Sequence, residues 1–141
     1  KLATPADLAR HTLLSYNTEP YGWPDWLANA GVPRLKPAGV LAFEQMYFAL
    51  QAAESGLGLV LVPLFLAIDD ILAGRLCTPF GLLHAKERHY YANAASHSPV
   101  TRSFYAWLQR EGEATEQSIE AWAKTPAYPP QRINPITPDI P

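Results

Sequence analysis

The pattern of hydrophobic and polar positions changes its period several times along the chain. Thr4 followed by Pro5 and Asp7 is typical of a helix start, close to a capping box. The segment His11–Tyr16 then has the character of a strand. Residues 17–37 are rich in Pro and Gly, which favours turns. Within these turns, three large apolar side chains predict one brief helical turn packed on the core: Trp23, Trp26 and Leu27.

From Phe43 onward the apolar positions recur at the helical period. One stripe contains Phe43, Tyr47, Leu50 and Ala53. Gly56 is well placed to end this helix in a left-handed conformation. The apolar run Leu59–Val62 predicts a strand covered on both faces, because a strand open to water would alternate. Gly56 and Gly58 precede the strand, whereas a phosphate cradle follows one, so we interpret them as a helix stop and close packing.

A second helix is predicted after Pro63. Its inner face would hold Leu64, Phe65, Ile68, Ile71 and Leu72, with Asp69 and Asp70 outward and Gly74 as the stop. Two short strands are then expected over Leu76–Phe80 and His89–Asn93. Strands alternating with helices imply an α/β fold with a mostly parallel sheet.

A third helical region begins at Ser98, the expected N-cap, with Pro99 at its first position. Its buried stripe would comprise Val100, Phe104, Trp107 and Leu108. We expect Gly112 to end this helix and a second one to cover roughly Ala114 to Lys124. After Thr125 the chain carries six prolines, which favours extended chain over helix or central strand.

Composition narrows the class of protein. The 141 residues support one ordinary domain or two small lobes, and 48% hydrophobic against 17% charged residues is typical of globular chains. A net charge of −2 argues against a surface that neutralises nucleic-acid phosphates. The lone Cys77 excludes an internal disulfide and suits a reducing cytoplasm. No apolar run is as long as a membrane span. The chain starts at Lys1 in mid-pattern, which we interpret as a domain fragment.

The sequence offers little catalytic chemistry. Phosphate loops, dinucleotide fingerprints and metalloprotease or nucleophile-elbow motifs are missing. His84 and His89 flank a loop without acidic or cysteine partners at the spacing of zinc ligands. Asp69 and Asp70 are adjacent and, on a helix, point about 100° apart, so they cannot face each other as an acid/base pair. We therefore expect no catalytic residue, no metal and no cofactor.

Several segments in order resemble the C-terminal part of LysR-type transcription regulators. These segments are Leu2–Leu14, the run Trp23–Leu27 followed by Gly31, Phe43–Gln45 through Leu50–Pro63, Gly74–Leu76, Tyr90–Tyr91, and Val100 with Phe104, Trp107 and Leu108. Each motif alone is weak, but their order and spacing are fairly specific, and they cover residues 1 to about 111. The likeness is greatest to the branch of the glycine-cleavage and β-lactamase activators.

This resemblance implies a type 2 periplasmic-binding-protein-like fold. It would have two α/β lobes with mostly parallel sheets and flanking helices, and one lobe would be incomplete in this chain. Residues 1–75 would form the second lobe, and residues 76–112 the crossover and the C-terminal part of the first lobe. Residues 113–141 would be a short helix and a Pro-rich tail that the family does not require.

The resemblance also implies a small-molecule effector bound between the lobes. The candidate contacts are Tyr16, Asn17, Phe43, Glu44, Gln45, Met46 and Tyr90. A helix start suits an anion, so an amino acid, a small carboxylate or a peptide-like molecule is expected. Glu44 would also complement the helix dipole without any ligand, or select an amine. For each tyrosine, core packing with a hydrogen-bonded hydroxyl is an equal alternative.

The implied whole protein is a cytoplasmic regulator that forms dimers or tetramers. It would bind DNA only through an N-terminal helix-turn-helix missing from these residues, and it would not bind a membrane. The alternatives are a transporter's solute-binding protein, which shares the ancestry of this fold, and a piece of an α/β enzyme. An export signal upstream would favour the first alternative, and turnover by the parent chain would favour the second.

Overall fold

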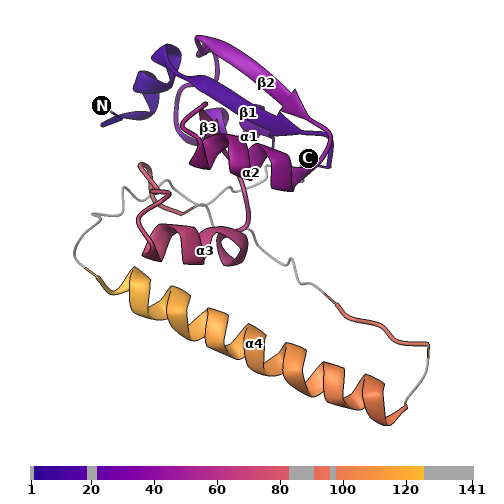
Figure 1. The fold of residues 1–141 in the computed structure, drawn as a ribbon. Helices are drawn as coiled ribbons and strands as arrows, with labels where there is room; N and C mark the ends of the chain where they lie inside the picture. The colour runs from indigo at the N-terminus through magenta and orange to yellow at the C-terminus, as the bar shows by residue number, and fades with distance from the viewer. Residues whose placement is uncertain (1, 19–21, 83–90, 96–97, 126–141) are drawn as a thin grey trace, which may run out of the picture.

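The computed structural model describes residues 2–18, 22–82, 91–95 and 98–125. Eight elements follow one another along these residues (Figure 1). They are the 3-10 helix η1 (Pro5–Arg10), β1 (Thr12–Tyr16), α1 (Trp23–Asn29), β2 (Gly39–Phe43), α2 (Met46–Glu54), β3 (Leu59–Val60), α3 (Leu64–Leu72) and α4 (Pro99–Ala123). The expected first helix, first strand and brief Trp-containing helix are confirmed, although the first helix is of the tighter 3-10 type.

The three strands form one parallel sheet in the order β2-β1-β3, which confirms the predicted α/β architecture. The central strand β1 pairs along its whole length with β2, from Thr12 opposite Gly39 to Tyr16 opposite Phe43. Neighbouring residues of a strand point to opposite faces of the sheet. Leu13 and Leu14 are both buried, so β1 must be covered by other elements on both sides.

One face of the sheet is covered by η1, α1 and the segment after α3. The buried cluster there consists of Leu8, Leu13, Trp23, Trp26, Leu27 and Phe80. Trp23 and Trp26 meet edge to face, with ring centroids 5.7 Å apart, a geometry that aromatic quadrupoles favour. The indole N–H of Trp23 donates a 2.9 Å hydrogen bond to the carbonyl of Leu14. This bond fixes α1 to the central strand.

The other face is covered by α2. Leu14 and Tyr16 of β1 pack there with Ala49 and Ala52 of α2, and the small alanines let the helix approach the strand closely. In β3, Leu59 packs against the first cluster and Val60 against the second. The predicted strand covered on both faces is therefore confirmed, although only two of its residues join the ladder.

Two glycines make the turn between α2 and β3 possible. Gly56 has φ of 77°, a left-handed conformation that favours glycine, and it follows the last turn of α2 as predicted. At Gly58, an added Cβ would lie 2.4 Å from the carbonyl oxygen of Thr12 and about 3.0 Å from the side chain of Leu14. Close packing against β1 thus explains why glycine occupies position 58, as the sequence indicated.

The predicted start of the helix from Phe43 was wrong. Phe43 is the last residue of β2, a strand that the sequence reasoning did not predict, and α2 begins three residues later at Met46. This shift changes the buried stripe of the helix. Ala49 and Ala52 are buried, whereas Tyr47 from the predicted stripe is 63% exposed.

Three further expectations in the middle of the chain need correction. On α3 the buried residues are Ala67 and Ile68, while Phe65 and Leu72, predicted to face inward, are exposed. The segment 76–80 is irregular, since Pro79 has no N–H to donate to a ladder. Residues 91–93 also form no strand, and the first two residues of that predicted strand, 89 and 90, lie outside the described residues.

Helix α4 differs most from its prediction. Ser98 caps it, accepting a 3.2 Å hydrogen bond from the backbone N–H of Thr101, as expected. However, the helix continues without a break through Gly112 to Ala123. No residue of α4 is fully buried, and the predicted buried stripe of Val100, Phe104, Trp107 and Leu108 is exposed. None of the described helices is long and apolar enough to cross a membrane.

Candidate functional site

Six of the seven predicted effector contacts converge at one edge of the sheet. Tyr16 and Phe43 are the last residues of the adjacent parallel strands β1 and β2 and lie opposite each other. The backbone N–H of Asn17 donates a 3.1 Å hydrogen bond to the carbonyl of Phe43, which continues the ladder past the strand ends. Open α/β sheets bind ligands outside the carboxyl ends of their strands. The seventh candidate, Tyr90, lies outside the described residues.

Tyr16 has a structural role in this arrangement. Its side chain is 4% exposed, within the cluster between β1 and α2. Its hydroxyl donates a 2.9 Å hydrogen bond to the carbonyl of Leu61, just after β3. The Tyr16 hydroxyl therefore links the central strand β1 to the residue that follows the edge strand β3. This arrangement agrees with the alternative expected for tyrosines, core packing with a hydrogen-bonded hydroxyl.

The loop into α2 presents the other candidates toward the surface. Glu44 and Gln45 are exposed, and Met46 is half-buried against the cluster between β1 and α2. Gln45 is the N-cap of α2, but its side chain makes no capping hydrogen bond, and no acidic residue lies in the first turn. The first backbone N–H groups of a helix have no partner within the helix. The backbone N–H groups at this helix start are thus able to donate hydrogen bonds to a group outside the helix.

Two aromatic side chains beside this edge were missed in the sequence reasoning. Tyr47 and Phe48 are 63% and 53% exposed, with ring centroids 6.0 Å apart. Gln51 donates a 2.9 Å hydrogen bond to the Tyr47 hydroxyl one turn further along. A helix start at Met46 would have revealed both, because it places the alanines inward and these rings outward. They give the edge an apolar surface next to its polar groups.

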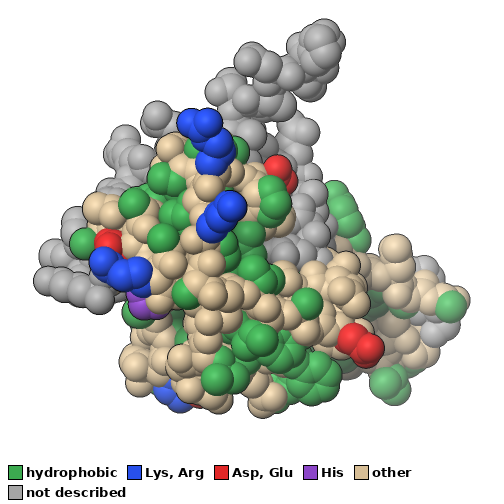
Figure 2. All heavy atoms as spheres, turned by 90° about the horizontal axis from the view of Figure 1, so that it is seen from above, with side chains coloured by type: hydrophobic (Ala, Val, Ile, Leu, Met, Phe, Trp, Pro, Cys, Tyr) green, Lys and Arg blue, Asp and Glu red, His purple; other side chains and the backbone are tan. Residues whose placement is uncertain are grey.

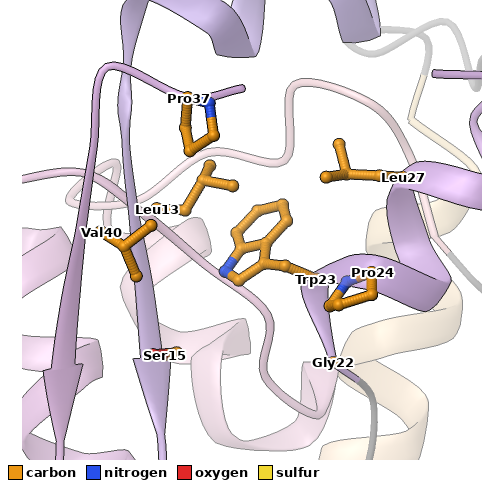
Figure 3. Close-up of a pocket in the computed structure, with 8 residues that line it drawn as sticks. All are labelled: Leu13, Ser15, Gly22, Trp23, Pro24, Leu27, Pro37 and Val40. Atoms are coloured by element: carbon orange, nitrogen blue, oxygen red, sulfur yellow. The ribbon is translucent and has the colours of Figure 1, made fainter. Parts of the chain in front are cut away.

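An apolar hollow of about 320 Å³ lies on the opposite side of the sheet, between β1, β2 and the start of α1 (Figure 3). It is lined by Leu13, Ser15, Gly22, Trp23, Pro24, Leu27, Pro37 and Val40. None of these is a predicted effector contact. Val40 is 61% exposed on the edge strand β2, and the face seen in Figure 2 carries many such apolar side chains.

Electrostatic interactions tie the far end of α2 to the segment after α3. The Arg75 Nε lies 2.8 Å from a carboxylate oxygen of Glu54, at the end of α2. The same guanidinium also pairs with Asp70 of α3. The hydrogen bond from Arg75 to Asp70, helped by the charges of both carboxylates, raises the pKa of Arg75 above its usual range. Arg75 therefore bridges α2 and α3 on the surface, at the predicted end of the second lobe.

At the other end of the chain, Asp7 organises the start of η1. Its carboxylate accepts hydrogen bonds from the backbone N–H groups of Thr4, at 2.8 Å, and Ala3, at 3.0 Å. Arg10 pairs with it at 2.6 Å. The bond from Thr4, followed by that from Ala3, lowers the pKa of Asp7 to about 2. In the described part of the chain, no three His, Cys, Asp or Glu side chains gather as a metal site.

The comparisons with known proteins agree in one family. The family model of the LysR substrate binding domain matches residues 1–113. The HTH-type transcriptional regulator TrpI of Pseudomonas aeruginosa is 33% identical over 110 residues, covering 77% of this chain and 37% of the relative. The HTH-type transcriptional activator AmpR of Rhodobacter capsulatus is 36% identical over 112 residues, with the same two coverages.

A third relative is the glycine cleavage system transcriptional activator of Escherichia coli strain K12. It is 29% identical over 121 residues, which cover 84% of this chain and 39% of the relative. The chain therefore spans 37% to 39% of the length of these relatives. No solved structure gives a significant match. The predicted likeness to LysR-type regulators and the periplasmic-binding-protein-like fold class are confirmed.

Proposed function

Because the chain belongs to the LysR substrate-binding-domain family, we propose that it carries part of the effector-sensing domain of a LysR-type transcription regulator. The match over residues 1–113 is the observation that carries this proposal. The three relatives described above are named as regulators or activators of transcription, which favours sensing over the transporter alternative and over enzymatic turnover. We infer that the chain has no catalytic role of its own.

The carboxyl edge of the sheet is the proposed effector site. An anionic group would accept hydrogen bonds from the start of α2, where Gln45 leaves the backbone N–H groups uncapped. Asn17 and Gln45 would add amide contacts, and the exposed Tyr47 would cover an apolar part of the ligand. An amino acid, a small carboxylate or a peptide-like molecule fits this combination. Glu44 beside the edge would favour a ligand that also carries an amine.

Sensing in this proposal proceeds through movement of two lobes. Residues 1–75 would form the second lobe and residues 76–112 the crossover and part of the first. A ligand held by both lobes stabilises the closed arrangement only as far as it binds that arrangement more tightly than the open one. Closure would change subunit contacts in a dimer or tetramer of the whole cytoplasmic regulator. DNA would be bound outside these residues, in keeping with their net charge of −2.

Thermal unfolding in the presence of amino acids, small carboxylates and cell-wall peptides tests this function on the whole regulator. At a hundredfold excess over its Kd, an effector stabilises the folded state by about 2.7 kcal/mol, a shift of several degrees. Gln45→Ala should reduce that shift, and the exposed Gln117→Ala on α4 serves as the matched control. If no compound raises the unfolding temperature, or if both variants respond alike, the proposed site is wrong.

Replacing Tyr16 with Phe separates packing from ligand contact. The variant keeps the buried ring but loses the hydrogen bond to the Leu61 carbonyl. We expect the free energy of unfolding to fall by about 1 kcal/mol, with effector affinity unchanged. Tyr47→Phe on the exposed surface should leave stability almost unaltered. A loss of affinity without loss of stability at Tyr16 would instead make it an effector contact.

A further inference from the structure

Helix α4 carries large apolar side chains on one face near both ends, and smaller or polar residues lie between them on that face: Glu111, Gly112, Thr115 and Ser118. In the C-terminal half, the half-buried side chains are Thr115, Ser118, Ile119 and Trp122, which follow helical spacing along one face. About three turns earlier, the same face carries Phe104, Trp107 and Leu108, all exposed. Thr101 and Tyr105 of the N-terminal half are half-buried as well, so the two halves differ in their large apolar side chains. We call the C-terminal half the covered half, because Ile119 and Trp122 are half-buried there, whereas the apolar residues of the other half named above are exposed.

The neighbour of the covered half is α3. The two helices are in contact, and α3 lies beside the C-terminal end of α4 in Figure 1. Ile68 of α3 is 1% exposed, yet neither Ile68 nor the buried Ala67 belongs to the two clusters that flank the sheet. Among the described elements, α4 is the helix with which α3 shares an extended contact. Within the described residues, the neighbour of α3 is therefore α4 rather than the sheet.

The covering half lies beyond the family match, which ends at residue 113. We propose that residues 114–123 act as a strap, which docks on α3 and ties it to the Pro99–Leu108 end of the same helix. If the two ends of α4 belong with different lobes, closure must bend α4 or release α3. That consequence for sensing rests on the proposed function, whereas the docking itself does not.

Gly112 is the point where such a strap would bend. It lies within the helix between the two halves of α4, and a Cβ added there would meet no atom within 4 Å. Glycine weakens a helix interior because its backbone is freer when unfolded. The side chain of Gln109 donates a 2.9 Å hydrogen bond to Glu113, spanning the glycine and supporting the helix on both sides. Alanine therefore fits at this position without a clash, while proline would remove a backbone bond.

Hydrogen exchange of the 141-residue chain, read by mass spectrometry over residues 64–73, tests the docking. The double variant Ile119→Ser/Trp122→Ser should reduce the protection of α3 by about tenfold, because local opening would no longer break apolar contacts. Trp107→Ser, on the exposed half of the same helix, is the matched control and should change it less than twofold. Unchanged exchange in the double variant, or an equal change in the control, would overturn the strap.

A second pair of variants keeps the test decisive if the double variant loses protection in β1 as well. Gly112→Ala should raise protection of residues 109–123 by about fivefold, in line with helix propensity. Gly112→Pro should lower protection of α3 while β1 stays protected. If α3 remains protected in Gly112→Pro, the strap is wrong. If these exchange results hold but no compound stabilises the regulator, the proposed function fails and the strap stands.

Discussion

The central strand and the longest helix use apolar residues in opposite ways. β1 has five residues and buries three of them, Leu13, Leu14 and Tyr16. Helix α4 has 25 residues and buries none completely, although it carries large apolar side chains near both of its ends. The strand lies between two layers, whereas among the described elements α3 is the one in extended contact with the helix. An apolar stripe therefore shows that a face suits burial, while the neighbours present decide whether it is buried.

The largest effect that tests this comparison is expected at Leu14, which is fully buried between β1 and α2. Leu14→Ala should lower the free energy of unfolding by about 3 kcal/mol, from lost transfer energy and the cavity left behind. Leu108→Ala, the same change on the 38% exposed position of α4, should cost less than about 1 kcal/mol. Urea denaturation measures both. Equal costs would mean that α4 is buried as deeply as the sheet.

A smaller but still clear effect is expected at Gly58. Alanine there would force its Cβ against the Thr12 carbonyl, a backbone atom that cannot turn away. We expect a loss of about 2 kcal/mol, typical of an overpacked core. Gly39→Ala is the matched control, since its Cβ would meet Thr12 only at 3.5 Å, an ordinary contact. If the two variants unfold at the same urea concentration, β1 and the turn before β3 are not packed this closely.

The smallest effect concerns Asp7 at the edge of the sheet region and depends on pH. Because its pKa is lowered from 3.8 to about 2, the carboxylate stabilises the folded state above pH 3.8, and this contribution is lost as pH falls through 2. Asp7→Ala should therefore be less stable than the parent chain near neutral pH, and the difference should narrow toward pH 2. Unfolding curves at several pH values measure it. A difference independent of pH would contradict the charged cap.

The parallel sheet and its buried central strand were predictable because their signals are local. A run such as Leu59–Val62 without polar residues has few alternatives to a strand covered on both sides. The strand β2 was missed because its apolar residues merge into the helical pattern that follows. Phe43 fits both periods, and only pairing with Tyr16 decides in favour of the strand. Such pairing between distant segments is not visible in a window of sequence.

The break expected at Gly112 fails for a related reason. One glycine costs a helix interior about 1 kcal/mol, which strong helix formers on both sides and the Gln109–Glu113 hydrogen bond can offset.

The candidate site, too, could be predicted from the sequence only in part. The sequence placed Asn17 and Gln45 near each other through family resemblance, and the structure brings both to one sheet edge. The outward direction of Tyr47 depended on a helix start that the pattern placed three residues too early.

The strand order β2-β1-β3 has a consequence for how the chain acquires its structure during synthesis. Of these three strands, β1 leaves the ribosome before the other two, yet Leu13 pairs with Val40 on one side and with Leu59 on the other, both of which are made later. Until then the backbone groups of β1 have no ladder partners, and each pairing must close a long loop of unfolded chain. The nascent sheet should thus be most vulnerable to aggregation, and most in need of a chaperone, while the segment between these partners is still being made.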